Sequence, residues 1–378
     1  MIGTSHPPSP QTYGRGLEGL VMGDSAISAI DGRQGRLLYR GYPVEDLVAH
    51  ADFETTSYLI LHGELPGSRE LAEWSAELRR WRRPPAAALE ALRRVPTGAH
   101  PLAQFRTMLT VAACHAPEPE DSTLDAQWRR PARILSWTSA LAAAAIRHLG
   151  GRDPVAPSEE PGFAADFLYR TLGRRPPDDE VRAFEASLIV QAEHGLHAAA
   201  LAALVVISTG ADLGSAVLAG IGALSGARHG GANQLAFEMM HRLDSPRSAR
   251  AWVRAALADG VRFPGFGHRV YHCPDPRVRA LEPFTERLLA QRGMTSRWRI
   301  YLALRDEIEQ ALAPKGIFAN VDSITGLLYH PMGLPASAMP IPFCLAIQTG
   351  WMAHCLEYLP GGPMIEPGAV YLDPERAR

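Results

Sequence analysis

Apolar residues recur at helical spacing along most of this chain, and this pattern limits the fold more than any other feature. In the longest stretches they stand three or four positions apart, which is typical of helices with one buried face. Many of them are alanines, whose small side chains allow helices to pack closely. The stretches predicted to be helical are 69–83, 132–149, 162–172, 178–208 and 248–257. We therefore predict an all-α fold.

One N-terminal segment has the pattern of a β-hairpin instead. Residues 26–30 and 36–40 read as short strands, and the residues 31–35 between them contain two glycines that suit a turn. The chain contains neither a strand followed by GxGxxG nor a GxxxxGK[ST] motif. A dinucleotide-binding or P-loop fold is therefore not expected.

The composition is that of a globular protein without a nucleic-acid partner. Of the 378 residues, 46% are hydrophobic and 21% are charged, and the formal net charge is −2. The length loosely indicates two domains, and a near-neutral chain without a basic block is a poor candidate for nucleic-acid binding. The longest apolar run, residues 198–207, is far short of the roughly 20 residues that span a bilayer. We expect no membrane association.

The cysteines and the N-terminus indicate a cytoplasmic protein. Cys114, Cys273, Cys344 and Cys355 form no CxxC pair, so we expect reduced thiols and no disulfide framework. The first 14 residues are rich in proline and serine and lack both an apolar signal core and an arginine-rich amphipathic pattern. They read as a loose tail.

Two histidines stand beside glycine turns, where the backbone can come close to a ligand. His229 is followed by two glycines and then by a helical pattern over 233–243. The positive end of that helix would lower the pKa of His229, and a neutral imidazole can donate a hydrogen bond to a carbonyl on which charge develops. His268 follows the sequence PGFG. On local pattern alone, an incidental histidine in a turn explains each position about as well.

Arg277 and a potential metal site follow His268 closely. Arg277 comes near the start of a predicted helix, where a positive charge is unfavourable unless an anion binds nearby. His268, His272 and Cys273 together could suggest metal ligands. The glycines and proline around them argue against one helix that aligns the three side chains, and no fourth ligand is evident. We expect no metal site.

An isolated carboxylate and a further histidine complete the candidate set. Asp322 begins an otherwise apolar helical stretch, where it would act either as an N-cap or as a general base in an apolar pocket. His194 lies within the alanine-rich helix predicted over 178–208. Its local sequence alone favours a buried core histidine.

Together these motifs resemble the citrate synthase family. The residues named above lie in the motifs AEH, HGGAN, GFGHRVY with DPR, and NVD. The segments GLEGLVMGDSAISAIDGRQGRLLYRGYPVEDL, LILHGELP and GWMAHCLE extend the resemblance over almost the whole chain from residue 16. Members of the family are nearly all-helical homodimers in which a large and a small domain close over a cleft. The resemblance implies a large domain of residues 1–229 and 334–378, and a small domain of residues 230–333.

The resemblance also implies a reaction and a role for each candidate. The family condenses acetyl-CoA with oxaloacetate and hydrolyses the resulting thioester, with no metal or bound cofactor. Asp322 would remove the thioester α-proton, His229 would stabilise the enol, and His268 would polarise the ketone of the 2-oxo acid. Preorganised donation of this kind contributes roughly 3–4 kcal/mol per donor. His194 and Arg277 would hold the 2-oxo acid.

The CoA site implied by the resemblance lies close to the same loops. It consists of a backbone loop that recognises the adenine and of the segment KGIFANVD before the base. The residues concerned are Arg262, Phe263, Pro264, Gly265 and Lys315.

Two arginines of the family pattern are missing from this chain. One should stand four residues before the tryptophan of GWMAHCLE, where this chain has Ile347, and the other near the C-terminus, where it has Glu366-Pro367-Gly368. In the family they hold substrate carboxylates, one of them across the dimer. No arginine occurs between Arg305 and Arg376, although 37 of the 38 basic residues are arginines. An acid carboxylate without its charged partner typically costs 2–5 kcal/mol per site, roughly.

Other differences from the family lie beside the chemistry. They are Ser323 and Ile324 in place of Phe-Tyr after the base, Arg228 in place of a leucine before His229, and His197 and Ala199 in place of an asparagine and a serine after His194. The residues that move protons are retained, whereas those that recognise the acid are altered.

We therefore predict an acyl-CoA-dependent carbon–carbon condensing enzyme, an acyltransferase that converts acyl into alkyl on transfer. Its 2-oxo-acid acceptor would carry fewer or differently placed carboxylates, or be more apolar, near Ile347 and Ile324. One alternative is an ordinary citrate or 2-methylcitrate synthase in which Arg228 replaces a lost charge. Others are a lyase for a citryl-CoA-like thioester and a catalytically silent CoA-binding paralogue.

Overall fold

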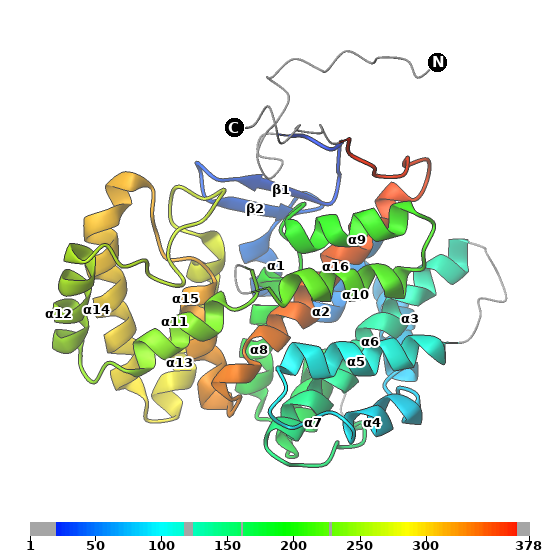
Figure 1. Cartoon of the computed structure of the whole chain (residues 1–378), viewed down its shortest axis with the longest axis horizontal. Coiled ribbons are helices and arrows are strands. Elements are labelled where there is room, and N and C mark those ends of the chain that lie inside the picture. The colour runs from blue at the N-terminus through cyan, green and yellow to red at the C-terminus, as the bar shows by residue number, and fades with distance from the viewer. Residues whose placement is uncertain (1–19, 117–123, 160–161, 227–228, 369–378) are drawn as a thin grey trace, which may run out of the picture.

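The chain is helical apart from a small sheet near its N-terminus (Figure 1). The structure is a computed structural model that describes residues 20–116, 124–159, 162–226 and 229–368. The α-helices are α1 (Val44–His50), α2 (Phe53–His62), α3 (Ser68–Arg80), α4 (Ala86–Leu92), α5 (Pro101–Cys114), α6 (Leu124–Leu149), α7 (Phe163–Leu172), α8 (Asp178–Val190), α9 (Ala198–Ser208), α10 (Leu213–Leu224), α11 (Ala232–His241), α12 (Pro246–Ala258), α13 (Pro276–Gln291), α14 (Thr295–Leu312), α15 (Asp322–Tyr329) and α16 (Pro340–Tyr358). The predicted all-α fold is confirmed.

The predicted hairpin is also present. The antiparallel sheet has the order β1 (Ser28–Asp31), β2 (Arg36–Tyr39), β3 (Tyr42–Pro43). In the turn between β1 and β2, the Asp31 carboxylate accepts hydrogen bonds from the N–H groups of Arg33 and Gln34, both at 2.9 Å. Gly35 then takes a left-handed conformation with φ of +63°, which glycine adopts without strain.

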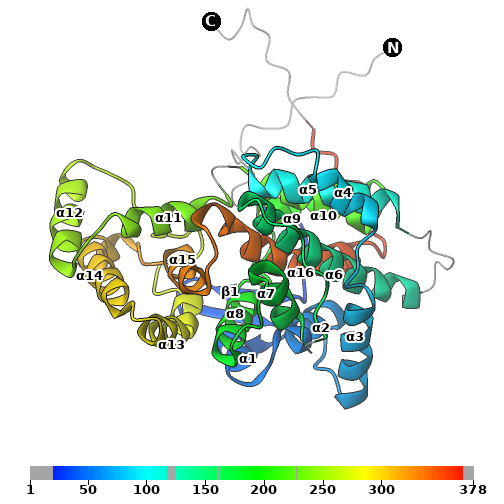
Figure 2. The same ribbon diagram turned by 90° about the horizontal axis from the view of Figure 1, so that it is seen from below.

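The helices form two groups, which both views show (Figures 1 and 2). Helices α11 to α15 lie together at one end of the molecule, and the other helices surround α16. Helix α16 contacts α2, α5, α6, α8, α9 and α10, and its residues are buried from Pro340 to Ala346 apart from Phe343. Helix α8 links the groups, because it contacts α13 and α15 as well as α16. None of the described helices is both long enough and apolar enough to cross a bilayer.

The single helix predicted over 178–208 is wrong in its middle. The structure has two helices, α8 and α9, separated by a loop of residues 191–197. Gly195 adopts φ of +67°, and its N–H donates to the buried carboxylate of Glu193. His197 occupies the N-cap position of α9, where its Nδ1 lies 3.3 Å from the N–H of Ala199. His194 is therefore a loop residue and does not lie on a helix.

Candidate active site

Five of the predicted residues line one cavity of about 920 Å³. They come from four separate parts of the chain: the loop before α9, the turn before α11, the loop before α13 with its first turn, and the start of α15. These residues are His194, His229, His268, Arg277 and Asp322. Candidates that are distant in the sequence therefore line the same cavity, together with His197 and Asn320.

Asp322 is the first residue of α15 and does not cap it. The cap position is Val321, and it makes no side-chain capping hydrogen bond. Asn320 holds the backbone here: its Oδ1 accepts from the N–H of Asp322 at 3.0 Å, and its Nδ2 donates to the carbonyl of Gly267 at 2.7 Å. Burial raises the pKa of Asp322 to about 6, although Arg277 partly opposes the rise. Asp322 is therefore a stronger base than an ordinary aspartate, yet it is ionised at neutral pH.

The loop that carries His268 lies directly against the start of α15. Gly265 has φ of +81°, and a Cβ there would lie 2.8 Å from the Cα of Ser323. The carbonyl of Gly265 accepts from the N–H of Asn320 at 2.9 Å. Only glycine fits this close approach, which fixes His268 and Asp322 on one rigid unit.

His268 is held as one tautomer by its own loop. Its Nδ1 accepts from the N–H groups of Val270 at 2.9 Å and Tyr271 at 3.1 Å. The proton of the neutral ring is therefore on Nε2. Burial, together with Arg277, lowers the pKa of His268 to about 4. At neutral pH this imidazole can donate a hydrogen bond while uncharged.

His194 and Arg277 flank His268. The His194 ring lies 5.0 Å from that of His268, and its Nε2 is 3.3 Å from the Tyr271 hydroxyl. Burial, assisted by Arg277, holds the pKa of His194 well below its usual range. Arg277 is itself buried and bidentately paired with Asp275, with its Nε 3.0 Å from Oδ1 and its Nη2 2.7 Å from Oδ2. A carboxylate in the cavity would meet an arginine that already has a partner.

His229 lies in the turn before α11, as the sequence indicated. Its N–H donates to the carbonyl of Gly226 at 2.9 Å. A Cβ on Gly230 would overlap the carbonyl oxygen of Leu224, so this turn requires glycine. The pKa of His229 is lowered as predicted, but the cause is burial of the ring.

A buried carboxylate orders the loop between α8 and α9. Glu193 Oε1 accepts from Ser28 Oγ at 2.9 Å and lies 3.0 Å from His354 Nε2. Burial alone would raise the pKa of Glu193, but His354 and the hydrogen bonds from Gly195 and Ser28 together outweigh burial and lower it. The loop that presents His194 is thereby joined to β1 and to α16.

The remaining predicted residues that the structure describes are not among those that line this cavity. Ile347 is fully buried in α16 and is not among the lining residues, whereas Phe343, one turn earlier, is. Four residues belong to the loop 262–265: Arg262 is exposed, Phe263 and Gly265 are buried, and Pro264 is half-buried. Lys315 is exposed at the end of the 3-10 helix Ala313–Lys315. Arg228 lies outside the described residues.

The metal ligands considered from the sequence do not form a site. Within residues 20–116, 124–159, 162–226 and 229–368, no group of three histidine, cysteine or acidic side chains could hold a metal ion. His268 uses Nδ1 for its own loop, and the Cys273 thiol contacts the carbonyl of Gly32 at 3.3 Å.

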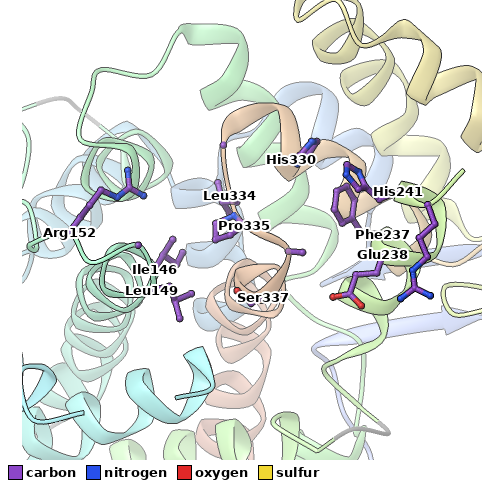
Figure 3. A pocket seen from close by; sticks show the side chains of 14 residues that line it. Ile146, Leu149, Arg152, Phe237, Glu238, His241, His330, Leu334, Pro335 and Ser337 are labelled. Carbon is purple, nitrogen blue, oxygen red and sulfur yellow. The ribbon is translucent and has the colours of Figure 1, made fainter. Parts of the chain in front are cut away.

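A second pocket, of about 680 Å³, shares no lining residue with the first. It lies between the end of α6 and α11, and Figure 3 shows His241 and His330 close together on its wall. Their rings are 5.5 Å apart, and Phe237 packs 4.9 Å from His330. None of the five candidates named above lines this pocket.

Sequence reasoning missed three lining residues. Asn320 was noted only as part of a motif, and Phe343 was overlooked for Ile347. His197 was noted only as a replacement, yet its Nδ1 lies 3.2 Å from Nε2 of His229. The only signal was the spacing of His194 and His197, which stand three positions apart, because such spacing in a tight loop can bring two imidazoles to one side.

Comparison with known proteins supports the resemblance drawn from the motifs. The family model described as "Citrate synthase, C-terminal domain" matches residues 16–368. A 2-methylcitrate synthase of Mycobacterium tuberculosis is 37% identical over 96% of this chain and 91% of its own length. A citrate synthase of Deinococcus radiodurans is 32% identical over 94% and 95%.

Solved structures agree with the sequence comparisons. Citrate synthase of Thermoplasma acidophilum, in a ternary complex with carboxymethyl coenzyme A and oxaloacetate, superposes with a TM-score of 0.90 at 30% identity, covering 95% of this chain and 96% of that one. The Pyrobaculum aerophilum enzyme gives 0.90 at 31% identity, covering 95% and 92%. The fold and these relatives define an enzyme that condenses an acyl-CoA. The chain belongs to the citrate synthase family.

Proposed function

We propose that this enzyme joins the α-carbon of an acyl-CoA to the carbonyl carbon of a 2-oxo acid and then hydrolyses the thioester. The observation that carries the proposal is a single cavity that holds Asp322, with a raised pKa, beside His229 and His268, with lowered pKa values. This pairing of a strengthened base with neutral donors suits removal of a proton next to a carbonyl.

The steps follow from the chemistry of the groups. Asp322 takes the α-proton, and the C–H electron pair moves toward the thioester oxygen, where His229 donates a hydrogen bond. The enol carbon then attacks the ketone carbon of the 2-oxo acid, which His268 polarises through Nε2–H. A carbon–carbon bond forms, and the ketone oxygen takes up a proton. Water finally cleaves the thioester and releases CoA as the thiol.

The charges around the cavity support an acceptor with fewer carboxylates than oxaloacetate. Of the described lining residues, the arginines are Arg269, which is exposed, and Arg277, which is paired with Asp275. The positions where the family pattern has arginine hold the buried Ile347 and the exposed residues 366–368. The rest of the wall includes apolar side chains such as Leu201 and Phe343. We propose a 2-oxo acid with an apolar side chain as acceptor.

A panel of 2-oxo acids tests the acceptor. With acetyl-, propionyl- and longer acyl-CoA, kcat/KM from thiol release should be at least about tenfold higher for an apolar 2-oxo acid than for oxaloacetate, because each unmatched carboxylate costs at least about 2 kcal/mol. Phe343→Arg, which places a cation on the cavity wall, should shift the preference toward oxaloacetate, whereas Phe343→Met, which keeps the position apolar, should not. A clear preference of the wild type for oxaloacetate would contradict the proposal.

That contrary result would favour an ordinary citrate or 2-methylcitrate synthase. The observation on its side is the 37% identity to a 2-methylcitrate synthase over 96% of this chain. In that case Arg228→Leu should raise the Michaelis constant for the 2-oxo acid. Supplying a citryl-CoA-like thioester and analysing the products would detect a lyase, and absence of α-proton exchange with every acceptor analogue would indicate a silent paralogue.

We further propose that residues 1–229 and 334–378 form a large domain and residues 230–333 a small one, which close over the cavity. The cavity walls support this division, because His194 and His229 fall in the first part and His268 and Asp322 in the second.

The CoA would bind at residues 262–265 and Lys315, beside the base. Measuring the Michaelis constant of Lys315→Ala for the acyl-CoA tests this site. The free thiols of all four cysteines support a cytoplasmic location.

Helix α9 is expected to lie in the interface of a homodimer. The sequence of α9, AAALAALVVIS, is apolar on all sides, yet Val205 on it is 37% exposed. A helix that is apolar all round is normally buried. Sedimentation velocity should show a dimer for the wild type and for Val261→Arg, whose valine is 46% exposed in the loop after α12, but a monomer for Val205→Arg. A monomeric wild type would contradict this interface.

A further inference from the structure

We infer that His197 is a positioning residue that fixes the tautomer of His229, and that Trp351 fixes the tautomer of His197. The inference rests on the proposed function, because it concerns the histidine assigned to enol stabilisation. It starts from a chain of three rings, in which Trp351 Nε1 lies 3.2 Å from His197 Nε2 and His197 Nδ1 lies 3.2 Å from His229 Nε2.

The indole of Trp351 sets the direction of the chain. An indole N–H can only donate, so Nε2 of His197 must carry a lone pair. Trp351 is fully buried in α16 and cannot turn away readily. Gly220 of α10 makes room for its ring, since a Cβ at that position would lie 2.6 Å from a ring carbon.

The proton of a neutral His197 is then on Nδ1. From there it points to Nε2 of His229, which accepts, and the proton of His229 is placed on its Nδ1. The N–H of Ala199 also approaches Nδ1 of His197, at 3.3 Å. Nδ1 could accept a hydrogen bond from Ala199 only if the proton of His197 were on Nε2. That proton would then face the N–H of Trp351. The Nδ1–H tautomer makes two of these contacts on separate ring atoms, whereas the Nε2–H tautomer offers one lone pair to both Ala199 and His229 and leaves the Trp351 N–H without this acceptor. The Nδ1–H tautomer is therefore favoured.

His197 is neutral in this setting. Burial, assisted by the neighbouring His229, lowers its pKa to about 4. The other charged or titratable groups around it are Glu193, which acts in the opposite direction, and His354 and Arg277, which act in the same direction as His229. An imidazolium would also set two N–H groups against each other at Trp351.

The consequence for catalysis is a single donor in a defined place. With its proton on Nδ1, His229 offers one N–H on the side of the ring away from His197. Without His197, both tautomers of His229 would be populated and the ring could turn. The family resemblance gives asparagine at position 197, and an asparagine amide can also accept from one side and donate to the other.

Three variants separate positioning from folding, since His197 also occupies the N-cap position of α9. They are His197→Ala, His197→Asn and Trp351→Phe, with His115→Ala as a control at an exposed position after α5. Each is first checked by circular dichroism. Two quantities are then measured: kcat and KM from thiol release, and the tautomer of His229 from imidazole ¹⁵N shifts of the free, full-length enzyme. The signal is assigned as the one lost in His229→Gln.

We expect wild-type His229 to show the Nδ1–H tautomer. In His197→Ala, kcat should fall about 10- to 100-fold with KM within about threefold, because a misplaced catalytic group affects the transition state more than the bound substrate. Its His229 should show mixed tautomers. Trp351→Phe should give an intermediate fall, and His197→Asn should restore both the single tautomer and kcat to within about tenfold.

Two results would overturn the inference: an Nε2–H tautomer of His229 in the wild type, or an unchanged tautomer and kcat in His197→Ala. If His197→Ala does not fold, the wild-type tautomer and the other two variants still decide. If the wild type releases no thiol with any acceptor, the proposed function fails, yet the tautomer of the free enzyme still tests this inference.

Discussion

Asp322→Asn is expected to lower thiol release and acyl-CoA α-proton exchange by about 10²- to 10⁴-fold, the range that general-base catalysis contributes. Asparagine keeps the shape of the side chain but cannot take up a proton. Binding should change little, so the loss should appear in kcat. Asp259→Asn, at the exposed C-cap of α12, is the matched control and should behave as the wild type. Exchange that persists in Asp322→Asn would remove Asp322 from the role of base.

The pH dependence gives a second measure of the same residue. Asp322 acts as a base only when it is ionised, and burial raises its pKa to about 6. The rate of exchange should therefore rise as the pH increases through about 6 and level off above it.

The same pKa shift predicts an effect on stability. A carboxyl whose pKa is raised in the folded state from the ordinary 3.8 favours folding when protonated, and this contribution is lost as the pH rises through about 6. The free energy of unfolding of Asp322→Asn, relative to the wild type, should accordingly be higher at pH 8 than at pH 5.

His229→Ala is expected to lower kcat by about 10²- to 10³-fold, as loss of one preorganised donor to a developing oxyanion does elsewhere. The carboxylate base is still present in this variant. The dependence on pH near 6 should therefore be retained, which separates its defect from that of Asp322→Asn. Since the ring supplies transition-state stabilisation, KM for the acyl-CoA should change little. A small loss of kcat, or a loss confined to KM, would contradict the role given to His229.

The sequence predicted much of the fold because the relevant forces are local. Helices such as α7 and the hairpin β1–β2 follow from apolar spacing and from a glycine turn. The break at residues 191–197 was not predicted in this way, because apolar helical spacing is present on both sides of it. What breaks the helix is distant in sequence: Glu193 contacts Ser28 of β1 and His354 of α16. The break is therefore a tertiary effect.

The site was predicted in part for a similar reason. His229 and His268 were found because glycine turns mark places where backbone and ligand can meet. Ile347 was expected near the acid, but α16 is apolar on every side, so its sequence does not tell which face meets the cavity. In the structure, Phe343 is the residue of α16 that lines the cavity. The contact between His197 and His229 joins two segments 32 positions apart, and no local pattern reports such a contact.

The loop between α8 and α9 has a consequence for how this enzyme can diversify. It is tied at Glu193 and again at His197, while Leu196 between them is 41% exposed and lines the cavity. A substitution at Leu196 would change the shape of the cavity. It would leave the contacts of Glu193 and His197 that hold the loop in place. The loop thus places side chains that hold the fold and a side chain that shapes the cavity on adjacent residues, so a single substitution can alter the cavity and leave His194 and His197 in place.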